Sequence, residues 1–256
     1  MKIKPLVSTV IFAIVAGSAL SACRGEPPRA SQPRIQAWLE AAGDSEAWRE
    51  VKNARFTITT VWFDSTGTEV RRRPRYVWIK KAPERSRIER QEREGYYIQG
   101  HDGTTPWATL DGVPLPVEHK ATAEALYVSR DVFYWIGLPY KLTDSGVFMQ
   151  PIPEDSIGLA GVRVSFGDDV GQHPGDRYFY YFGDDSPLPV EVHYIEQGHT
   201  DVNRTRWKDF HQAGSITYVG TREWYNEQGI RTKQLIVTDV VINPGVADSL
   251  FAPPAS

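Results

Sequence analysis

The sequence predicts an α+β protein in which helices cover the concave face of one strongly curved antiparallel β-sheet of about eleven strands. Most of the chain beyond residue 55 consists of short runs of β-branched and aromatic residues separated by turn residues. The connections between these runs are mostly short, which favours antiparallel neighbours, because parallel neighbours need a long crossover. A sheet of this size tends to curl. The two helical regions of the sequence then have one sheet to cover.

The first helical region is predicted between Ser31 and Gly43, with Pro33 in its first turn. Its apolar residues recur at helical spacing: Ile35, Trp38, Leu39 and Ala42. A second short helix is predicted to follow from Asp44. The other helical region spans residues 117–136 and ends before Pro139, because a proline disfavours helix in the residue before it.

The remaining segments read as strands joined by turns. They are 56–63, 68–80, 86–93, 96–100, 106–110, 146–150, 161–167, 177–182, 188–196, 203–211, 216–225 and 230–242. Several are apolar on both faces, and every position from Tyr178 to Phe182 is aromatic. A sheet packed on one face alone does not need this pattern. We therefore expect aromatic side chains to line a ligand cavity between the sheet and its helices.

Six aromatic residues are the candidates for lining that cavity: Trp62, Trp78, Trp107, Trp135, Tyr180 and Trp224. For each of them alone, ordinary core packing is the alternative interpretation. As a group they are consistent with a dry pocket that needs no catalytic residue. Sequestering a sixteen-carbon chain from water is worth on the order of 12 kcal/mol by methylene counting.

The N-terminus has the features of a cleavable export signal: Lys2 and Lys4, then an apolar run from Leu6 to Leu20. The run is shorter than the about 20 residues that span a bilayer. The next residues complete Leu-Ser-Ala-Cys, which resembles the lipobox at which bacteria attach diacylglycerol to the cysteine and cleave before it. We expect lipidation of Cys23, the only cysteine of the chain. A plain secretory leader that leaves a free thiol is the alternative.

Three segments are therefore expected: a lipoprotein signal peptide over 1–22, a lipidated cysteine with its tether over 23–33, and a single domain over 34–256. The tether is rich in proline and polar residues, as in an extended spacer. Several acyl chains would hold the protein on a membrane far more firmly than a single one. Arg24 resembles the pattern that sends a lipoprotein to the outer membrane, facing the periplasm, since aspartate there is the usual signal for retention.

Charge argues against nucleic acid as a partner. The formal net charge is −3, and loss of Lys2 and Lys4 with the leader leaves 27 basic against 32 acidic residues, or about −5. No basic excess is available to neutralise phosphates. Arginines do cluster from Arg71 to Arg75, with more from Arg85 to Arg93. They predict either a strip facing anionic headgroups or a solvated face paired with Glu89, Glu92 and Glu94, and we favour the second.

Sequence signatures of catalysis or of metal binding are weak. There is no G-x-S-x-G motif, no H-E-x-x-H motif and no pair of histidines four residues apart. Asp168, Asp169, His173 and Asp176 gather in one loop but lack the spacing of a calcium loop. We expect no cofactor and no metal. A polar enzyme site in the 168–177 loop is kept as an alternative.

The C-terminal segment from Val240 to Pro254 carries an "I-N-P … D-x-L-F … P" pattern that resembles the closing strand of periplasmic lipoprotein carriers. The phrases 134–142 and 101–107 are similar to a branch of bacterial lipoproteins with the same fold. Together with the order of elements, they resemble the outer-membrane lipoprotein-sorting (LolA/LolB-like) superfamily. That resemblance implies an incomplete barrel plugged by helices, with a cavity that holds acyl chains.

The function expected from the sequence is a lipid-anchored envelope protein that binds an acyl chain, a lipoprotein or another apolar ligand without catalysis. Its expected partners are the membrane, through the N-terminal lipid, and the lipid or lipoprotein ligand. Two alternatives remain: an envelope enzyme that uses the 168–177 loop, and a structural or assembly module whose sheet is fully packed.

Overall fold

The computed structural model describes residues 33–152, 157–167, 170 and 175–254. The expected leader, Cys23 and nearly all of the tether therefore lie outside the described residues. Within the described part, no helix has both the length and the apolar character needed to cross a bilayer.

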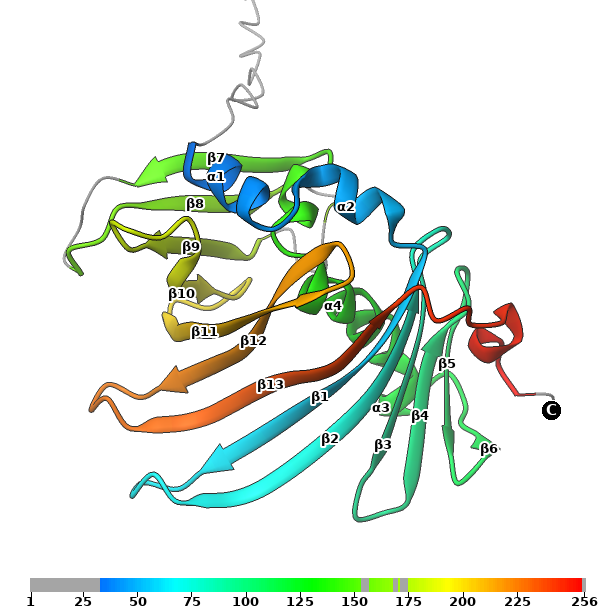
Figure 1. Cartoon of the computed structure of the whole chain (residues 1–256). Coiled ribbons are helices and arrows are strands. Elements are labelled where there is room, and N and C mark those ends of the chain that lie inside the picture. The colour runs from blue at the N-terminus through cyan, green and yellow to red at the C-terminus, as the bar shows by residue number, and fades with distance from the viewer. Residues whose placement is uncertain (1–32, 153–156, 168–169, 171–174, 255–256) are drawn as a thin grey trace, which may run out of the picture.

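The described strands form one antiparallel sheet of thirteen strands, which is curved and open (Figure 1). They are β1 (Asn53–Phe63), β2 (Glu69–Lys80), β3 (Arg85–Gln91), β4 (Tyr96–His101), β5 (Pro106–Leu110), β6 (Val113–Pro114), β7 (Val147–Ile152), β8 (Gly161–Phe166), β9 (Arg177–Phe182), β10 (Pro189–Ile195), β11 (Asn203–Ala213), β12 (Ile216–Tyr225) and β13 (Arg231–Ile242). The structure confirms the predicted α+β class and antiparallel curved sheet. The count exceeds eleven partly because β6 is too short to leave a periodic signal.

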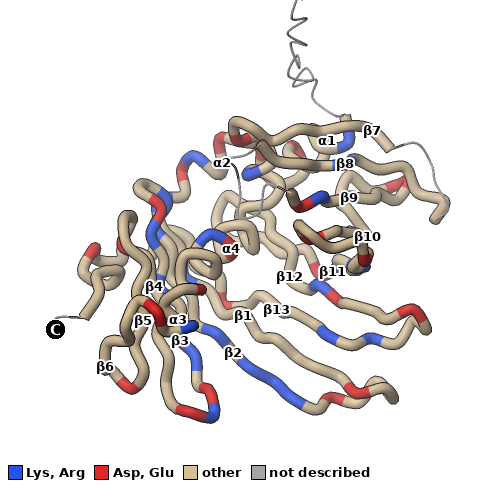
Figure 2. The backbone as a smooth tube through the Cα atoms, turned by 180° about the vertical axis from the view of Figure 1, so that it is seen from behind, with Lys and Arg blue, Asp and Glu red and all other residues tan. Residues whose placement is uncertain are grey.

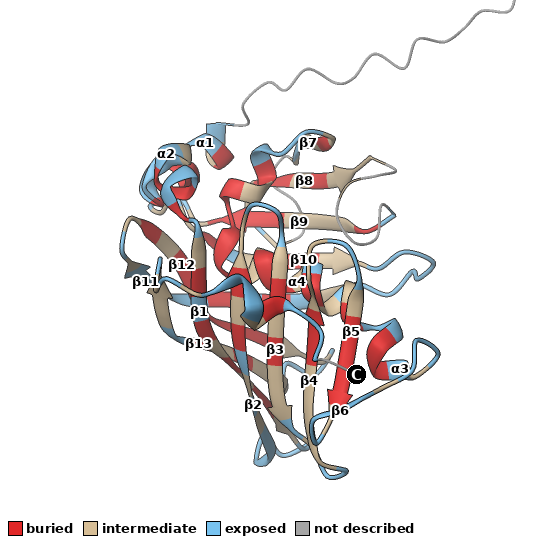
Figure 3. Ribbon diagram, turned by 90° about the vertical axis from the view of Figure 1, so that its right-hand side faces the viewer, coloured by how far each residue is buried: buried red, intermediate tan, exposed pale blue. Residues whose placement is uncertain are grey.

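The two edge strands of the sheet follow each other in the sequence. The strand order is β6-β5-β4-β3-β2-β1-β13-β12-β11-β10-β9-β8-β7, so β6 and β7 lie at opposite edges. The chain crosses between them through α3 (Lys120–Ala123), α4 (Ala125–Gly137) and the 3₁₀ helix η1 (Tyr140–Thr143). Helix α4 contacts β2, β3, β4, β5 and β12 across the concave side. Buried residues concentrate where helix and sheet meet (Figure 3).

The N-terminal helices α1 (Pro33–Ala41) and α2 (Asp44–Glu50) pack at the other end of the concave face. Trp38 of α1 is 1% exposed, and its ring lies 5.6 Å from Tyr180, 6.2 Å from Phe182 and 6.1 Å from Trp207. Trp48 of α2 stacks on Tyr140 at 5.5 Å with an angle of 4° between the rings. The predicted first helix is thus confirmed, and its apolar stripe joins it to β9 and β11.

The C-terminal segment closes the structure on the outside. Asn243 has a φ of 55°, and its Oδ1 accepts from the backbone N–H of Lys52 at 2.7 Å while its Nδ2 donates to the carbonyl of Glu50 at 3.0 Å. Beyond it, the 3₁₀ helix η2 (Asp248–Phe251) buries Phe251 completely. The "I-N-P … D-x-L-F" pattern therefore serves to fasten the chain end to the start of β1 and to β3.

We expect Trp38→Ala to lower the free energy of unfolding by about 3–5 kcal/mol, because it deletes a buried indole and leaves a cavity among three rings. Urea unfolding followed by circular dichroism measures the loss. Gln36→Ala on the exposed side of α1 is the control and should change stability by less than about 0.5 kcal/mol. Equal stability of the two variants would show that α1 does not anchor this end of the sheet.

Candidate functional site

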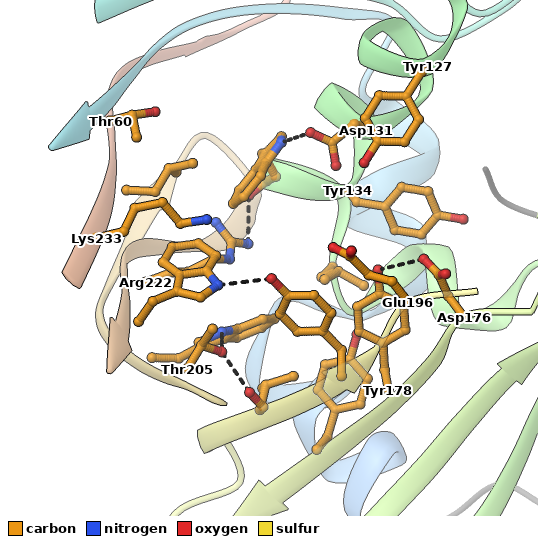
Figure 4. A pocket seen from close by; sticks show the side chains of 18 of the residues that line it. Thr60, Tyr127, Asp131, Tyr134, Asp176, Tyr178, Glu196, Thr205, Arg222 and Lys233 are labelled. Atoms are coloured by element: carbon orange, nitrogen blue, oxygen red, sulfur yellow. Dashed lines mark hydrogen bonds between the residues drawn. The ribbon is translucent and has the colours of Figure 1, made fainter. Parts of the chain in front are cut away.

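A cavity of about 650 Å³ lies between α4 and the concave face of the sheet. Its walls come from β1, β2 and the strands from β8 to β13, with α4 on the opposite side (Figure 4). This volume falls within the roughly 300–1,000 Å³ typical of ligand pockets. The layers of the protein are therefore separated here by a hollow.

One wall of the cavity is built from interlocked aromatic rings. Tyr178 stacks on Tyr194 at 5.6 Å, and Tyr180 meets Trp207 edge-on at 5.7 Å. The polar atoms of these rings are hydrogen-bonded: Trp224 Nε1 donates to Tyr194 Oη at 2.9 Å, and Trp207 Nε1 donates to a threonine hydroxyl at 3.0 Å. The wall thus offers apolar ring faces to the cavity, and the indole N–H groups of Trp207 and Trp224 are already bonded to other protein groups.

The structure brings together four of the six aromatic residues that the sequence suggested: Trp62, Trp135, Tyr180 and Trp224 all line this cavity. Trp78 and Trp107 do not line it. Trp78 alternates along β2 with two core residues, so its side chain lies on the outer face. Trp107 donates its indole N–H to the carbonyl of Phe251 in η2 at 3.0 Å.

The expectation of a dry, apolar pocket is wrong in one respect, because charged side chains also line the cavity. They include Arg75 on β2, Arg222 on β12, Lys233 on β13 and Asp131 on α4. The sequence contained a signal for the cations. Side chains two residues apart on a strand point to the same face of a sheet. Each of the three cations lies two residues from another residue of the cavity lining on its own strand, so the alternation places it on the inner face.

Arg222 is the most enclosed of these charges, at 4% exposed. Its guanidinium lies between two indole rings, with Cζ 4.4 Å from the ring centre of Trp135 and 4.7 Å from that of Trp207. Its Nη2 donates to the carbonyl oxygen of Trp135 at 3.2 Å. Burial lowers the pKa of Arg222 to about 9. The group is therefore held rigidly in a poorly solvated place.

Lys233 on β13 and Arg75 on β2 line the same cavity as Arg222. The strand register places Lys233 opposite Trp62 of β1 and opposite Trp224 of β12, and its Nζ lies 3.9 Å from the ring centre of Trp224. Burial lowers the pKa of Lys233, and it lowers that of Arg75 to about 10. Figure 4 shows Lys233 and Arg222 among the side chains that line the hollow.

Asp131 is the carboxylate that α4 contributes to the cavity. Trp135 Nε1 donates to its Oδ2 at 2.7 Å. Burial nevertheless raises the pKa of Asp131, even though this hydrogen bond and the charges of Arg75, Arg222 and Lys233 act in the opposite direction. The carboxylate is thus less stable in the folded protein than in water.

The other polar clusters noted in the sequence show no comparable site. His173, Asp168 and Asp169 lie outside the described residues, and Asp176 accepts from the backbone N–H of Gln197 at 2.7 Å through Oδ1. Among the residues that the structure describes, no group of three metal-ligating side chains comes together.

Figure 2 marks the basic residues along β2 and β3, and six of the seven arginines of these two strands form ion pairs, Arg75 being the exception among the residues described. Arg71 and Arg73 reach Glu92 at 3.1 and 2.5 Å, and Arg87 reaches Glu89 at 2.6 Å. The expectation of a solvated outer face holds only in part, because Arg73 and Arg75 line the cavity and Glu94 forms no ion pair within the described residues. The predicted pairs with Glu89 and Glu92 are confirmed.

Comparison with known proteins identifies the fold. No family model and no curated protein matches the sequence. The LolA superfamily protein NE2245 from Nitrosomonas europaea superposes with a TM-score of 0.55 at 12% identity, covering 85% of this chain and 97% of that one. A DUF1329 family protein from Desulfovibrio piger superposes with a TM-score of 0.54 at 10% identity, covering 86% and 96%. The chain has the LolA-like fold, and at these identities the likeness concerns the fold alone.

We expect Asp131→Asn to stabilise the protein at neutral pH, because the amide can still accept from Trp135 and carries no charge. A carboxyl group with a raised pKa contributes stability below its ordinary pKa of 3.8, and this contribution is lost as the pH rises through the folded value. The advantage of the variant should therefore vanish on acidification below about pH 4. Urea unfolding at a series of pH values measures the difference. A constant difference at every pH would contradict this account of Asp131.

Proposed function

We propose that this protein binds an acyl chain or a similar apolar group in the cavity between α4 and the sheet, without catalysis, and that the lipid on Cys23 anchors it in the cell envelope. The observation that carries the proposal is the cavity itself, a hollow of about 650 Å³ with an aromatic wall. Tightly packed layers would have pointed to a structural module.

The energetics of this task favour simple binding. Transfer of each methylene from water to an apolar surface is worth about 0.8 kcal/mol. The rings of Tyr178, Tyr180 and Trp207 provide such a surface, and Trp38 of α1 supports it from behind. A preformed wall of this kind binds hydrocarbon with little loss of side-chain entropy.

The shared fold with a LolA superfamily protein supports the proposal through architecture, since an open curved sheet plugged by helices is suited to enclosing a ligand. The enzyme alternative has less support. The part of the 168–177 loop that the structure describes includes Asp176, whose carboxylate is engaged by the Gln197 backbone and by the hydroxyl of Tyr178 at 3.5 Å.

Filling the hollow should block binding. Thr60 of β1 lies on the cavity wall, opposite Arg73 and Leu235 on the neighbouring strands. We expect Thr60→Trp to weaken binding of an alkyl probe such as dodecanol at least about tenfold, because the added ring occupies the ligand volume, a loss of roughly 1.4 kcal/mol. Quenching of tryptophan fluorescence and calorimetry measure the affinity.

Thr59→Trp is the matched control, since Thr59 is the same residue on the same strand with its side chain on the opposite face. It should bind dodecanol as the unmodified protein does. Equal affinities for the two variants, with both folded by circular dichroism, would contradict binding in this cavity. Absence of dodecanol binding by the unmodified protein would contradict the proposed function altogether.

The anchor is tested separately. We expect Cys23→Ser to move the protein from the membrane fraction to the soluble fraction and to abolish incorporation of labelled palmitate, because acyl chains at about 0.8 kcal/mol per methylene provide the attachment. Fractionation with immunoblotting measures the distribution. Continued sedimentation of the variant with membranes would show that another contact holds the protein there.

A further inference from the structure

Three cations at one end of the cavity have no carboxylate partner. Among the residues that the structure describes, Arg75, Arg222 and Lys233 make no ion pair, although other arginines of β2 and β3 do. Buried charges in proteins are normally paired or hydrogen-bonded, because leaving water is costly for them. These three cations of the cavity therefore lack an ion-pair partner in the part of the chain that the structure describes.

Arg222 shows most directly where a partner is missing. Its Cζ lies within 5 Å of the ring centres of Trp135 and Trp207, at 4.4 and 4.7 Å, and its Nη2 donates to the carbonyl of Trp135. Its Nη1 is buried and has no hydrogen-bond acceptor within the described residues. The Nε of Arg75 is likewise buried and has no hydrogen-bond acceptor in the part of the chain that the structure covers. Arg73 lines the same hollow and its Nε also lacks an acceptor, so three guanidinium groups of the lining each hold a buried donor without an acceptor among the described residues.

The protein's own acids do not supply the missing charge. Asp131 faces the three cations and accepts a hydrogen bond from Trp135; one carboxylate against three cations leaves an excess of positive charge. Two other acids line the cavity: Asp176 is engaged by the backbone of Gln197 and by Tyr178, and the charge of Glu196 acts on Lys233 without forming an ion pair among the described residues (Figure 4). Arg73, nearby on β2, is already paired with Glu92.

The cationic end continues directly into the aromatic wall. Lys233 lies on the face of Trp224, whose indole N–H donates to Tyr194, which in turn stacks on Tyr178. Arg222 likewise contacts Trp207, which meets Tyr180. A single molecule lying in the hollow would therefore meet charge at one end and apolar ring faces along the rest.

We propose that the cavity selects amphiphiles with an anionic head, a carboxylate or a phosphate, which Arg222, Arg75 and Lys233 bind while the hydrocarbon lies against the aromatic wall. This inference rests on the proposed function and narrows its ligand class. Guanidinium groups suit such heads because their planar N–H donors match two oxygens of a carboxylate or phosphate.

The test compares ligands that share a tail and differ in the head. Dodecanoate, dodecyl phosphate, dodecanol and dodecylamine are titrated into the full chain below their critical micelle concentrations, with tryptophan fluorescence and calorimetry as readouts. We expect the two anionic probes to bind at least about tenfold more tightly than dodecanol, and dodecylamine to bind most weakly. Acetate and inorganic phosphate, which have the head without the tail, should compete only weakly.

Substitution of single cations tests whether they cause the preference for anionic heads. Arg222→Met and Arg75→Met should each lower the ratio of dodecanoate affinity to dodecanol affinity about tenfold or more, because the substitution removes a head contact and keeps an apolar side chain. Arg206→Met is the matched control, since this arginine is exposed on the neighbouring strand β11 and stacks over Tyr225 outside the cavity. Circular dichroism establishes that each variant is folded, and Lys233→Met provides a third position if one arginine variant is not.

The outcomes separate the two proposals. Equal affinity of the unmodified protein for dodecanoate and dodecanol would overturn the selection for anionic heads and leave apolar binding intact. Tight competition by inorganic phosphate alone would instead overturn the role of the hydrocarbon. Loss of dodecanoate binding in Arg206→Met to the same extent as in Arg222→Met would show that overall charge, and not the cavity, attracts the anion.

Discussion

The structure depends on one topological constraint: two strands that follow each other in the sequence lie at opposite edges of the same sheet. The segment between β6 and β7 must therefore cross the whole sheet, and it does so on the concave side as α3, α4 and η1. Helix α4 contacts β2 to β5 and also β12. It therefore spans the concave side of the curved sheet. The space left beneath it, bounded by β1, β2 and the strands from β8 to β13, is the cavity.

That arrangement also explains why the cavity is amphipathic. Its aromatic wall is supported from behind by Trp38 of α1, so the rings keep their places without a ligand. Its cations come from the middle strands β2, β12 and β13, where a helix one layer away supplies a single carboxylate, Asp131. Burying such charges against the sheet lowers the free energy of unfolding, and destabilising arrangements of this kind are common at functional sites.

The sequence predicts the fold class, the first helix and most strands because these follow from local periodicity and turn residues. It identifies Trp62, Tyr180 and Trp224 on the sheet and Trp135 on α4, but it also selects Trp78 and Trp107, which lie on the outer face. Residue type alone does not distinguish the two faces; the register does. The cations were missed because Arg75 sits within an arginine run that reads as solvated, and the isolation of Arg222 from acids arises only from tertiary packing.

The most direct test of a ligand-binding cavity is the content of the protein purified from its own cells without detergent. Organic extraction followed by mass spectrometry releases whatever lies beneath α4, whereas a lipid bonded covalently to Cys23 stays with the chain. The account predicts an extractable amphiphile with a carboxylate or phosphate head, in an amount close to one per protein. Extracts free of any amphiphile, together with a crystal structure in which α4 rests on β8 to β11, would contradict it.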